Sequence, residues 1–254
     1  MRGLILAAGR GSRMAAATED RPKALVELGG VALLDWQLAA LGGAGIRDIG
    51  LVRGYRGADF AGRGLALFDN PRWAATNMVA SLAMARPWLE SGTCVVSYAD
   101  IFYPAEAVRR LMAAEGDIVL AYDPDWLQLW SRRFDDPLAD AETFRTDTAG
   151  RVTEIGGKTA DLADIKGQYV GLFRLTPAGW NRIDAYLAGC EPAVRAKLDM
   201  TGLLRRLIAA GADIRGVPIP GPWGEVDQQS DLALYEGMIA RDALRHLAPE
   251  PTGA

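Results

Sequence analysis

Near the start of the chain, a loop with two glycines and two arginines follows directly after an apolar run. Leu4 to Ala8 leads straight into Gly9-Arg10-Gly11-Ser12-Arg13. Glycines let backbone N–H groups approach phosphate oxygens without a side chain in the way. Arginine adds positive charge and forked donors that suit phosphate. We therefore predict a loop that binds a nucleotide polyphosphate. Its predicted contacts are Leu6, Ala7, Ala8, Gly9, Arg10, Gly11, Ser12 and Arg13.

Two other phosphate-binding motifs do not fit this loop. A P-loop needs G-x-x-x-x-G-K-[ST], and no lysine follows a glycine here at that spacing. A dinucleotide fingerprint needs G-x-G-x-x-G, but Met14 stands where the third glycine belongs, which disfavours an NAD-dependent oxidoreductase. Taken alone, the loop is also compatible with a strand followed by a solvated turn.

A second motif follows at positions 21 to 25, Arg-Pro-Lys-Ala-Leu. LAAGRGSR at 6–13 and PKAL at 22–25 together resemble the hallmark of the GT-A-like nucleotidyltransferase superfamily, the nucleoside-diphosphate-sugar pyrophosphorylases, which reads L-A-A-G-x-G-x-R, a spacer, then P-K-x-L. The resemblance implies that the loop wraps a triphosphate whose charge Arg13 and Lys23 neutralise, as catalytic residues.

Further segments narrow this resemblance and cover nearly the whole chain. They are similar to segments of phosphocholine cytidylyltransferases and 2-aminoethylphosphonate cytidylyltransferases, and read TNMVASL, SYADIF, RFDDPLADAETF, GQYVGLF, LDMTGLL and WGEVD. The resemblance implies CTP as the nucleotide and a small molecule with a phosphate or phosphonate as the acceptor.

Two aspartates are placed to hold a metal ion. Nucleotidyl transfer needs in-line placement of the attacking oxygen and neutralisation of the leaving pyrophosphate, and Mg²⁺ held by one or two carboxylates suits this need. Asp100 follows the strand-like run CVVSYA, and Asp227 lies in WGEVDQQSD. Each aspartate could instead cap a turn or helix. The resemblance implies metal-holding aspartates in both contexts, with Glu225 as a neighbour that could serve instead.

Residues 69 to 85, DNPRWAATNMVASLAMA, offer polar groups for a base. Thr76, Asn77 and Ser81 could supply donors and acceptors at the start of a helix, and simple N-capping by Thr76 or Asn77 is compatible with that role. The family often has a second Asn after Asn77, where this chain has Met78. The expectation that the nucleotide is CTP therefore rests on the resemblance and not on the spacing of these residues.

The acceptor needs an anion site and a site for the rest of the molecule. Lys158, in EIGGK, is predicted to bind its phosphate and orient the attacking oxygen. Arg132 and Arg133 could clamp the same anion or pair with nearby aspartates, and Tyr169 and Glu225 complete the predicted set. A choline-like cation would favour aromatic rings, offered by Trp126, Trp130, Phe134, Tyr169 and Trp223. An aminoethyl ammonium could instead meet Asp140, Glu142 or Asp147.

These features predict a Mg²⁺-dependent cytidylyltransferase that moves CMP from CTP to a phosphonate or phosphorylated small molecule and releases pyrophosphate. A general base is unnecessary because the attacking oxygen is already ionised. One alternative is a sugar-1-phosphate nucleotidyltransferase that uses UTP, dTTP or CTP. Another is a non-catalytic, nucleotide-binding regulatory protein.

The elements that must position these residues alternate between short apolar runs and helical patterns. Strands are expected at 3–7, 49–52, 93–97, 118–122 and 214–219, and helices at 33–44, 79–89, 105–114, 177–187, 200–210 and 231–247. This order predicts a Rossmann-like α/β fold, with a mixed, mostly parallel sheet and helices on both faces. Residues 126–175 are expected to form a small antiparallel lid. A single domain is expected over 1–248, with a disordered tail at 249–254.

Composition excludes several classes of partner. The 254 residues include 32 acidic and 28 basic side chains, so no nucleic-acid partner is expected. No run approaches the ~20 apolar residues of a membrane helix, and Cys94 and Cys190 show no metal-ligand spacing, so we expect a cytoplasmic protein without a membrane partner. His246, near the C-terminus, is a poor basis for a histidine-dependent mechanism. The oligomeric state stays open, with a homodimer among the options.

Overall fold

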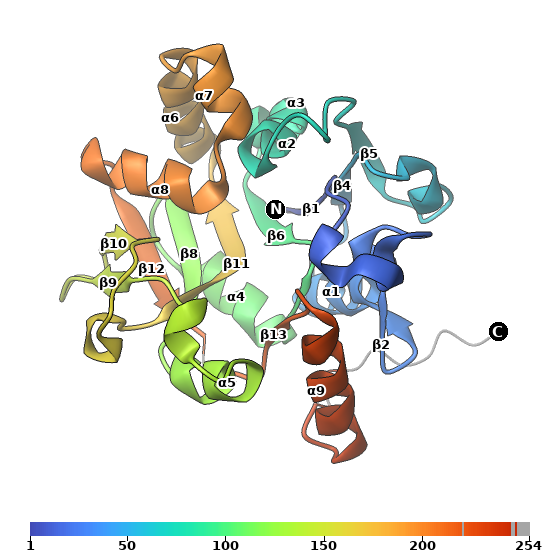
Figure 1. Ribbon diagram of the computed structural model, residues 1–254. Coiled ribbons are helices and arrows are strands. Elements are labelled where there is room, and N and C mark those ends of the chain that lie inside the picture. Colours follow the sequence, from blue (N-terminus) through green and yellow to red (C-terminus); the bar gives the residue numbers. More distant parts are fainter. Residues whose placement is uncertain (220, 245–246, 248–254) are drawn as a thin grey trace.

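The computed structural model describes residues 1–219, 221–244 and 247, and is built on a seven-stranded sheet (Figure 1). The strand order is β12-β8-β11-β6-β1-β4-β5, and every neighbouring pair is parallel except the two that involve β11. The strands are β1 (Arg2–Ala7), β4 (Ile49–Arg53), β5 (Ala66–Asp69), β6 (Cys94–Tyr98), β8 (Ile118–Asp123), β11 (Gln168–Leu175) and β12 (Ile214–Pro218).

The apolar runs form strands because both faces of the sheet are buried. Leu4 and Ile5 on β1 are fully buried and belong to two different core clusters, as expected from side chains that alternate across a strand. A parallel strand covered on both faces reads as a continuous apolar run rather than an alternating one. This explains why the strand leading into the glycine-rich loop has no polar residue beyond Arg2.

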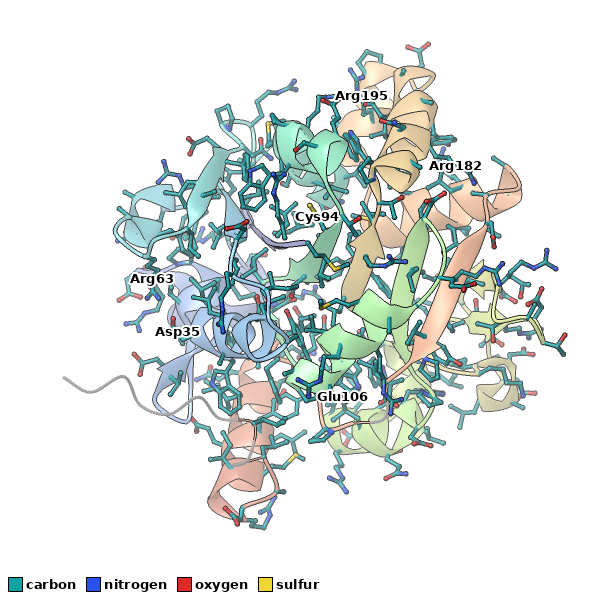
Figure 2. All side chains as sticks on the ribbon, turned by 180° about the vertical axis from the view of Figure 1, so that it is seen from behind. Asp35, Arg63, Cys94, Glu106, Arg182 and Arg195 are labelled. Carbon is teal, nitrogen blue, oxygen red and sulfur yellow. The ribbon has the colours of Figure 1, made fainter. Side chains whose placement is uncertain are left out.

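Helices cover both faces of the sheet, which confirms the predicted architecture. On one face α1 (Leu33–Gly43) packs against α4 (Ala105–Ala113), and both contribute to the cluster that contains Ile5. The other face carries α2 (Met78–Met84), α3 (Arg86–Ser91), α6 (Pro177–Ala188), α7 (Pro192–Lys197) and α8 (Met200–Ala209). Seen from behind, Glu106 marks α4, and Arg182 and Arg195 mark the opposite end of the molecule (Figure 2).

Smaller elements lie beyond the carboxyl ends of the central strands. A third core cluster contains Met14, Phe102 and Tyr235, and so joins the first loop to the C-terminal helix. The elements are the short helices at 12–18, 23–25, 57–60, 137–139 and 162–164, the strand pairs β2 (Glu27–Leu28) with β3 (Val31–Ala32), β7 (Ile101–Phe102) with β13 (Gly224–Glu225) and β9 (Phe144–Thr146) with β10 (Val152–Ile155), and the helices α5 (Trp126–Arg133) and α9 (Gln229–Ala240).

The structure corrects three expectations. Residues 168–175 are not part of a lid: β11 lies inside the main sheet, antiparallel to β6 and β8, and seven of its eight residues are buried there. The helix expected at 79–89 is two helices, since α2 reaches its C-cap at Ala85 and α3 follows with Pro87 in its first turn. The last helix ends at Ala240 rather than at 247.

Two other expectations fall on residues whose structure is not described. The predicted disordered tail at 249–254 and His246 lie outside the described residues. Within the described part of the chain, every helix is too short or too polar to cross a membrane.

Candidate active site

A cavity of about 290 Å³ opens at the carboxyl ends of β1 and β6. Ligands bind at this edge in open α/β sheets. Of the residues predicted to contact the nucleotide, all but Arg10 line this cavity, whereas the Arg10 guanidinium lies 5.5 Å from the centre of the Tyr55 ring. The full lining is Leu6, Ala7, Ala8, Gly9, Gly11, Ser12, Arg13, Lys23, Ala24, Trp73, Thr76, Asn77, Met78, Ser81, Tyr98, Ala99, Asp100 and Asp227.

The two glycines of the loop serve different purposes. Gly11 has φ +75°, and a Cβ there would lie 2.8 Å from the Lys23 side chain, so glycine lets the loop turn and pack against Lys23. A Cβ on Gly9 would meet no atom within 4 Å. Gly9 therefore presents bare backbone to open space, which is the surface that a phosphate chain requires.

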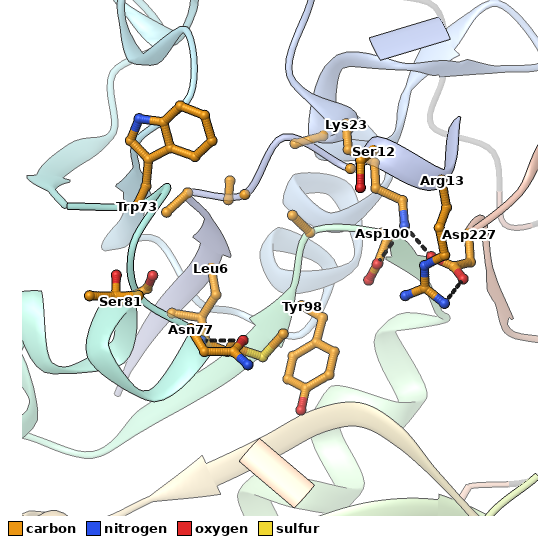
Figure 3. Close-up of a pocket in the computed structure, with 18 residues that line it drawn as sticks. Leu6, Ser12, Arg13, Lys23, Trp73, Asn77, Ser81, Tyr98, Asp100 and Asp227 are labelled. Carbon is orange, nitrogen blue, oxygen red and sulfur yellow. Dashed lines mark hydrogen bonds and ion pairs between the residues drawn. The ribbon is translucent and has the colours of Figure 1, made fainter. Parts of the chain in front are cut away.

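Lys23 joins the two predicted aspartates. Its side chain is 9 % exposed, and Nζ donates to Asp100 Oδ2 and to Asp227 Oδ1, each at 2.8 Å. Arg13 forms an ion pair with the same Asp227. Burial disfavours the ammonium, but the charges and hydrogen bonds of the two aspartates outweigh burial and raise the pKa of Lys23. Four residues distant in sequence thus converge as charged groups (Figure 3).

Three carboxylates form a compact acidic cluster beside Lys23. Asp100, Glu225 and Asp227 each offer an oxygen within 4.8 Å of the others. Asp100 Oδ1 is buried without a hydrogen-bond partner. Burial, followed by the charge of Asp100, raises the pKa of Glu225 to about 7. A buried, unsatisfied oxygen among close carboxylates fits a hard divalent cation such as Mg²⁺.

The Arg133 side chain contacts the acidic cluster through Glu225 and the neighbouring Asp231. Its buried guanidinium donates to both oxygens of Asp231, at 2.9 and 3.1 Å, and to Glu225 at 3.1 Å. Asp231 in turn accepts from the backbone N–H of Asp227 at 2.9 Å. The anion-clamp role predicted for Arg133 conflicts with this geometry, because its side chain is only 1 % exposed and three of its five N–H donors are used by carboxylates.

Gln37 and Asp231 are positioning residues that sequence reasoning missed. Gln37 is fully buried on α1, and its Nε2 donates to the carbonyls of Tyr98 at 2.8 Å and Ile101 at 2.6 Å, on either side of Asp100. Asp231 belongs to the capping box at the start of α9. Gln37 could have been noticed in the sequence, because it is a polar residue on the apolar side of the helix predicted at 33–44.

A second cavity of about 260 Å³ adjoins the first and shares Arg13, Tyr98 and Asp227 with it. Tyr169 and Glu225, both predicted on the acceptor side, line it. Its remaining lining residues are Trp130, Asp140, Glu142, Thr143, Ile155, Gln168, Val170, Gly171, Thr201 and Trp223. Carboxylates thus outnumber the basic residue that lines this cavity.

The other basic residues predicted to bind the acceptor lie elsewhere. Lys158 is exposed, and its Nζ donates to the backbone carbonyls of Asp140 at 3.0 Å and Ala141 at 3.3 Å. Arg132 is exposed and lines a separate hollow beside Trp223. Neither side chain is among the residues that line the two adjoining cavities, so direct acceptor contact stays a prediction that the geometry does not support.

The polar residues predicted for the base lie at the other end of the first cavity. Asn77 and Ser81 lie together with Trp73, on the side opposite Lys23 and Asp100 (Figure 3). Asn77 also caps α2, since its Oδ1 accepts from the backbone N–H of Met78 at 2.8 Å. Capping and cavity lining are therefore compatible, as predicted.

Comparison with known proteins agrees with this geometry. A family model, the MobA-like NTP transferase domain, matches residues 3–160, which is more than half of the chain. The chain belongs to this family. It is 33% identical over 249 residues to a CTP:phosphoglutamine cytidylyltransferase of Campylobacter jejuni, covering 91% of this chain and 98% of the relative.

Two further likenesses concern the sequence and the fold respectively. The chain is 26% identical to a 2-aminoethylphosphonate cytidylyltransferase of Lancefieldella rimae, over 65% of this chain and 64% of that protein. Its fold matches the inositol-1-phosphate CTP transferase from T. maritima with a TM-score of 0.75 and 20% identity, covering 100% of this chain and 98% of the other. The resemblance and the fold class predicted from sequence are thereby confirmed.

Proposed function

We propose that this nucleotidyltransferase is a Mg²⁺-dependent cytidylyltransferase that transfers CMP from CTP to a phosphate or phosphonate on a small, ammonium-bearing acceptor. The observation that carries the proposal is the junction of two cavities. Arg13 and Asp227 line both cavities, and Lys23 and Asp100 meet Asp227 at their boundary. A nucleotide in one cavity and an acceptor in the other would bring the reacting groups together at this junction.

The chain's own residues supply binding and charge. The backbone at Gly9 and Gly11, with Arg13 and Lys23, holds the triphosphate and neutralises the negative charge on the departing pyrophosphate. An acceptor oxygen forms a bond to the α-phosphorus, and the bond from that phosphorus to the oxygen bridging to the β-phosphate breaks. The bonding electrons leave with pyrophosphate. The acceptor oxygen is already ionised near neutral pH, so no side chain has to remove a proton.

Asp100, Glu225 and Asp227 are the residues that would hold Mg²⁺. When bound, the ion would neutralise phosphate charge and help to orient the substrates. Lys23 uses Asp100 Oδ2 and Asp227 Oδ1, which leaves Asp100 Oδ1 and the Glu225 carboxylate as further ligands.

The second cavity supports an ammonium on the acceptor. Glu142 lines it, is partly buried, and receives no hydrogen bond on its carboxylate among the described residues. Asp140 is nearby, fixed by the Trp130 indole N–H at 3.1 Å. Carboxylates and aromatic rings together attract a substrate cation. Asp147, the third candidate from sequence, instead pairs with Arg151 at 2.7 Å.

A substrate panel tests the proposal through pyrophosphate release with Mg²⁺. CTP, UTP and dTTP are each combined with 2-aminoethylphosphonate, phosphocholine, phosphoglutamine and glucose 1-phosphate. We expect CTP with an ammonium-bearing acceptor to react fastest. Faster reaction of UTP or dTTP with glucose 1-phosphate would overturn the substrate assignment. CTP binding without pyrophosphate release from any acceptor would favour a regulatory nucleotide-binding protein.

A further inference from the structure

A buried asparagine lies behind the base end of the first cavity. Asn70 follows β5 and is 2 % exposed. The backbone N–H of Arg72 donates to Asn70 Oδ1 at 3.0 Å, which identifies the oxygen end of the amide. The NH₂ end therefore faces two hydroxyls, donating to Thr76 Oγ1 at 3.1 Å and to Ser81 Oγ at 3.0 Å.

These hydrogen bonds leave the two hydroxyls with different roles. Each hydroxyl has one proton to donate. Thr76 donates its proton to the backbone carbonyl of Arg72 at 2.9 Å. Ser81 accepts from Asn70, and its own proton has no acceptor among the described residues. Ser81 also lines the first cavity. It therefore presents a hydrogen-bond donor to whatever occupies this end.

This end of the cavity is where the base of a bound nucleotide would lie. Ser81 and Trp73 are on the side opposite Lys23, which would bind the triphosphate, and Asp100, which would hold Mg²⁺ (Figure 3). Ring nitrogen N3 of cytosine is an acceptor, whereas uracil and thymine carry N3–H. A donor facing N3 would pair with cytosine but would set two protons against each other with uracil or thymine.

We propose that Asn70 is a positioning residue for base selection. By donating to Ser81 it keeps the Ser81 proton directed into the cavity, and this donor selects cytosine over uracil and thymine. Asn70 does not itself line the first cavity, so it acts through Ser81. The inference rests on the proposed function, because it takes the first cavity as the CTP site.

The first test isolates the contact between Ser81 and N3 by equilibrium binding. CTP, UTP and 3-deazacytidine triphosphate, in which carbon replaces N3, are titrated into the wild type and Ser81→Ala by calorimetry. We expect the wild type to bind CTP ~10-fold more tightly than either alternative, and Ser81→Ala to lose this preference. Equal weakening of CTP and the deaza analogue by Ser81→Ala would overturn the inference.

The second test reverses the polarity of Asn70. In Asn70→Asp the carboxylate still accepts a hydrogen bond from the Arg72 backbone N–H. It has no proton to donate to Ser81, so the Ser81 hydroxyl would donate to the carboxylate instead. Ser81 would then present an oxygen lone pair, a hydrogen-bond acceptor, to the cavity. We expect the ratio of kcat/KM for CTP to that for UTP, measured by pyrophosphate release, to fall ~100-fold, since one contact is lost and the opposite one gained. An unchanged ratio would overturn the inference.

Two further variants keep this test decisive. Asn70→Ser removes the amide donor without adding charge and should bring the CTP-to-UTP ratio close to unity, whether or not Asn70→Asp folds. Asn181→Asp makes the same chemical change at an exposed site on α6 and should leave the ratio unchanged. Absence of CTP binding and of pyrophosphate release in the wild type would contradict the proposed function. Full activity with an unchanged CTP-to-UTP ratio of kcat/KM in every Asn70 and Ser81 variant would contradict this inference alone.

Discussion

The two adjoining cavities are built in different ways. Most residues that line the nucleotide cavity come from three short stretches, 6–13, 23–24 and 73–81, and its phosphate end is bare backbone at Gly9 beside Arg13 and Lys23. The proposed acceptor cavity draws its lining from many elements between positions 13 and 227. Under the proposed assignment, phosphate binding is encoded locally, whereas acceptor choice depends on long-range packing.

The two cavities also differ in charge. Arg13 and Lys23 give the nucleotide side its cations, while Asp140 and Glu142 give the acceptor side carboxylates away from the reacting centre. Changes on the nucleotide side should therefore affect every acceptor equally. Changes on the acceptor side should alter selectivity and leave CTP binding intact. Four substitutions test this difference between the two cavities, and they are described from the largest expected effect on activity to the smallest.

Lys23→Met should have the largest effect. Removing a preorganised charge at the leaving group should lower turnover ~10²–10³-fold with every acceptor. It also leaves Asp100 and Asp227 close together without their shared cation, at a cost of about 3 kcal/mol in stability. Because the pKa of Lys23 is raised on folding, its stabilisation is present below the ordinary lysine pKa of 10.5 and is lost as pH rises through the folded value.

Single-turnover pyrophosphate release and thermal unfolding measure both effects of Lys23→Met. Wild-type turnover in a folded variant would contradict the role assigned to Lys23.

Asp100→Asn should raise the Mg²⁺ concentration needed for half-maximal activity ~10-fold or more, because a charged oxygen leaves the acidic cluster. Direct titration of Mn²⁺, followed by electron paramagnetic resonance, gives a readout independent of turnover. Asp48→Asn, on the exposed surface, is the matched control. Equal Mn²⁺ affinity in the wild type and Asp100→Asn would remove Asp100 from the metal site.

Glu142→Gln should raise KM for ammonium-bearing acceptors ~10-fold, because a charged hydrogen bond is lost, while KM for CTP stays constant. Burial raises the pKa of Glu142, so kcat/KM for the acceptor should increase with pH through that raised value in the wild type and stay flat in the variant. A parallel rise in both KM values would show that the two cavities are not separate sites.

The same substitution should make the protein more stable at neutral pH. Since its pKa is raised on folding, the folded state binds the Glu142 proton more tightly than the unfolded state does. The free energy of unfolding of the wild type therefore falls as pH rises from the ordinary pKa of 4.5 through the folded value. Glutamine lacks this ionisation, so thermal unfolding of Glu142→Gln at pH 7 should occur at a higher temperature than that of the wild type.

Lys158→Ala should have the smallest effect, within ~2-fold on all kinetic constants, because its ammonium binds backbone carbonyls on the protein surface. If Lys158→Ala instead lowered kcat/KM by two orders of magnitude with every acceptor, the direct anion contact predicted from sequence would be supported.

The sequence predicts those parts of the site that follow from contiguous motifs. The loop after β1 and the PKAL segment can be read directly, because backbone geometry and nearby cations suffice for phosphate binding. Asp100 and Asp227 could be chosen from their positions after strands. Their pairing with Lys23 could not, since contacts across 77 and 204 residues depend on the completed fold.

Other features were hidden because local sequence does not encode the partner. The pattern of β11 is compatible with a lid hairpin, and only its insertion between β6 and β8 explains its burial. From sequence, Arg133 could either clamp an anion or pair with nearby aspartates, and Lys158 is predicted to bind an anion. In the structure Arg133 pairs with the more distant Glu225 and Asp231, and Lys158 binds backbone carbonyls. Charge alone therefore does not distinguish a ligand-binding residue from a positioning residue.

Transfer of label from CTP tests the central claim most directly. The wild type is incubated with Mg²⁺, an ammonium-bearing phosphonate and CTP radiolabelled at either the α- or the γ-phosphorus, and the products are separated. The account predicts that the α-label appears in a CMP–acceptor conjugate and the γ-label in pyrophosphate, in equal amounts. An α-label that stays in CTP, or is released as free CMP, with every phosphate and phosphonate acceptor would contradict it.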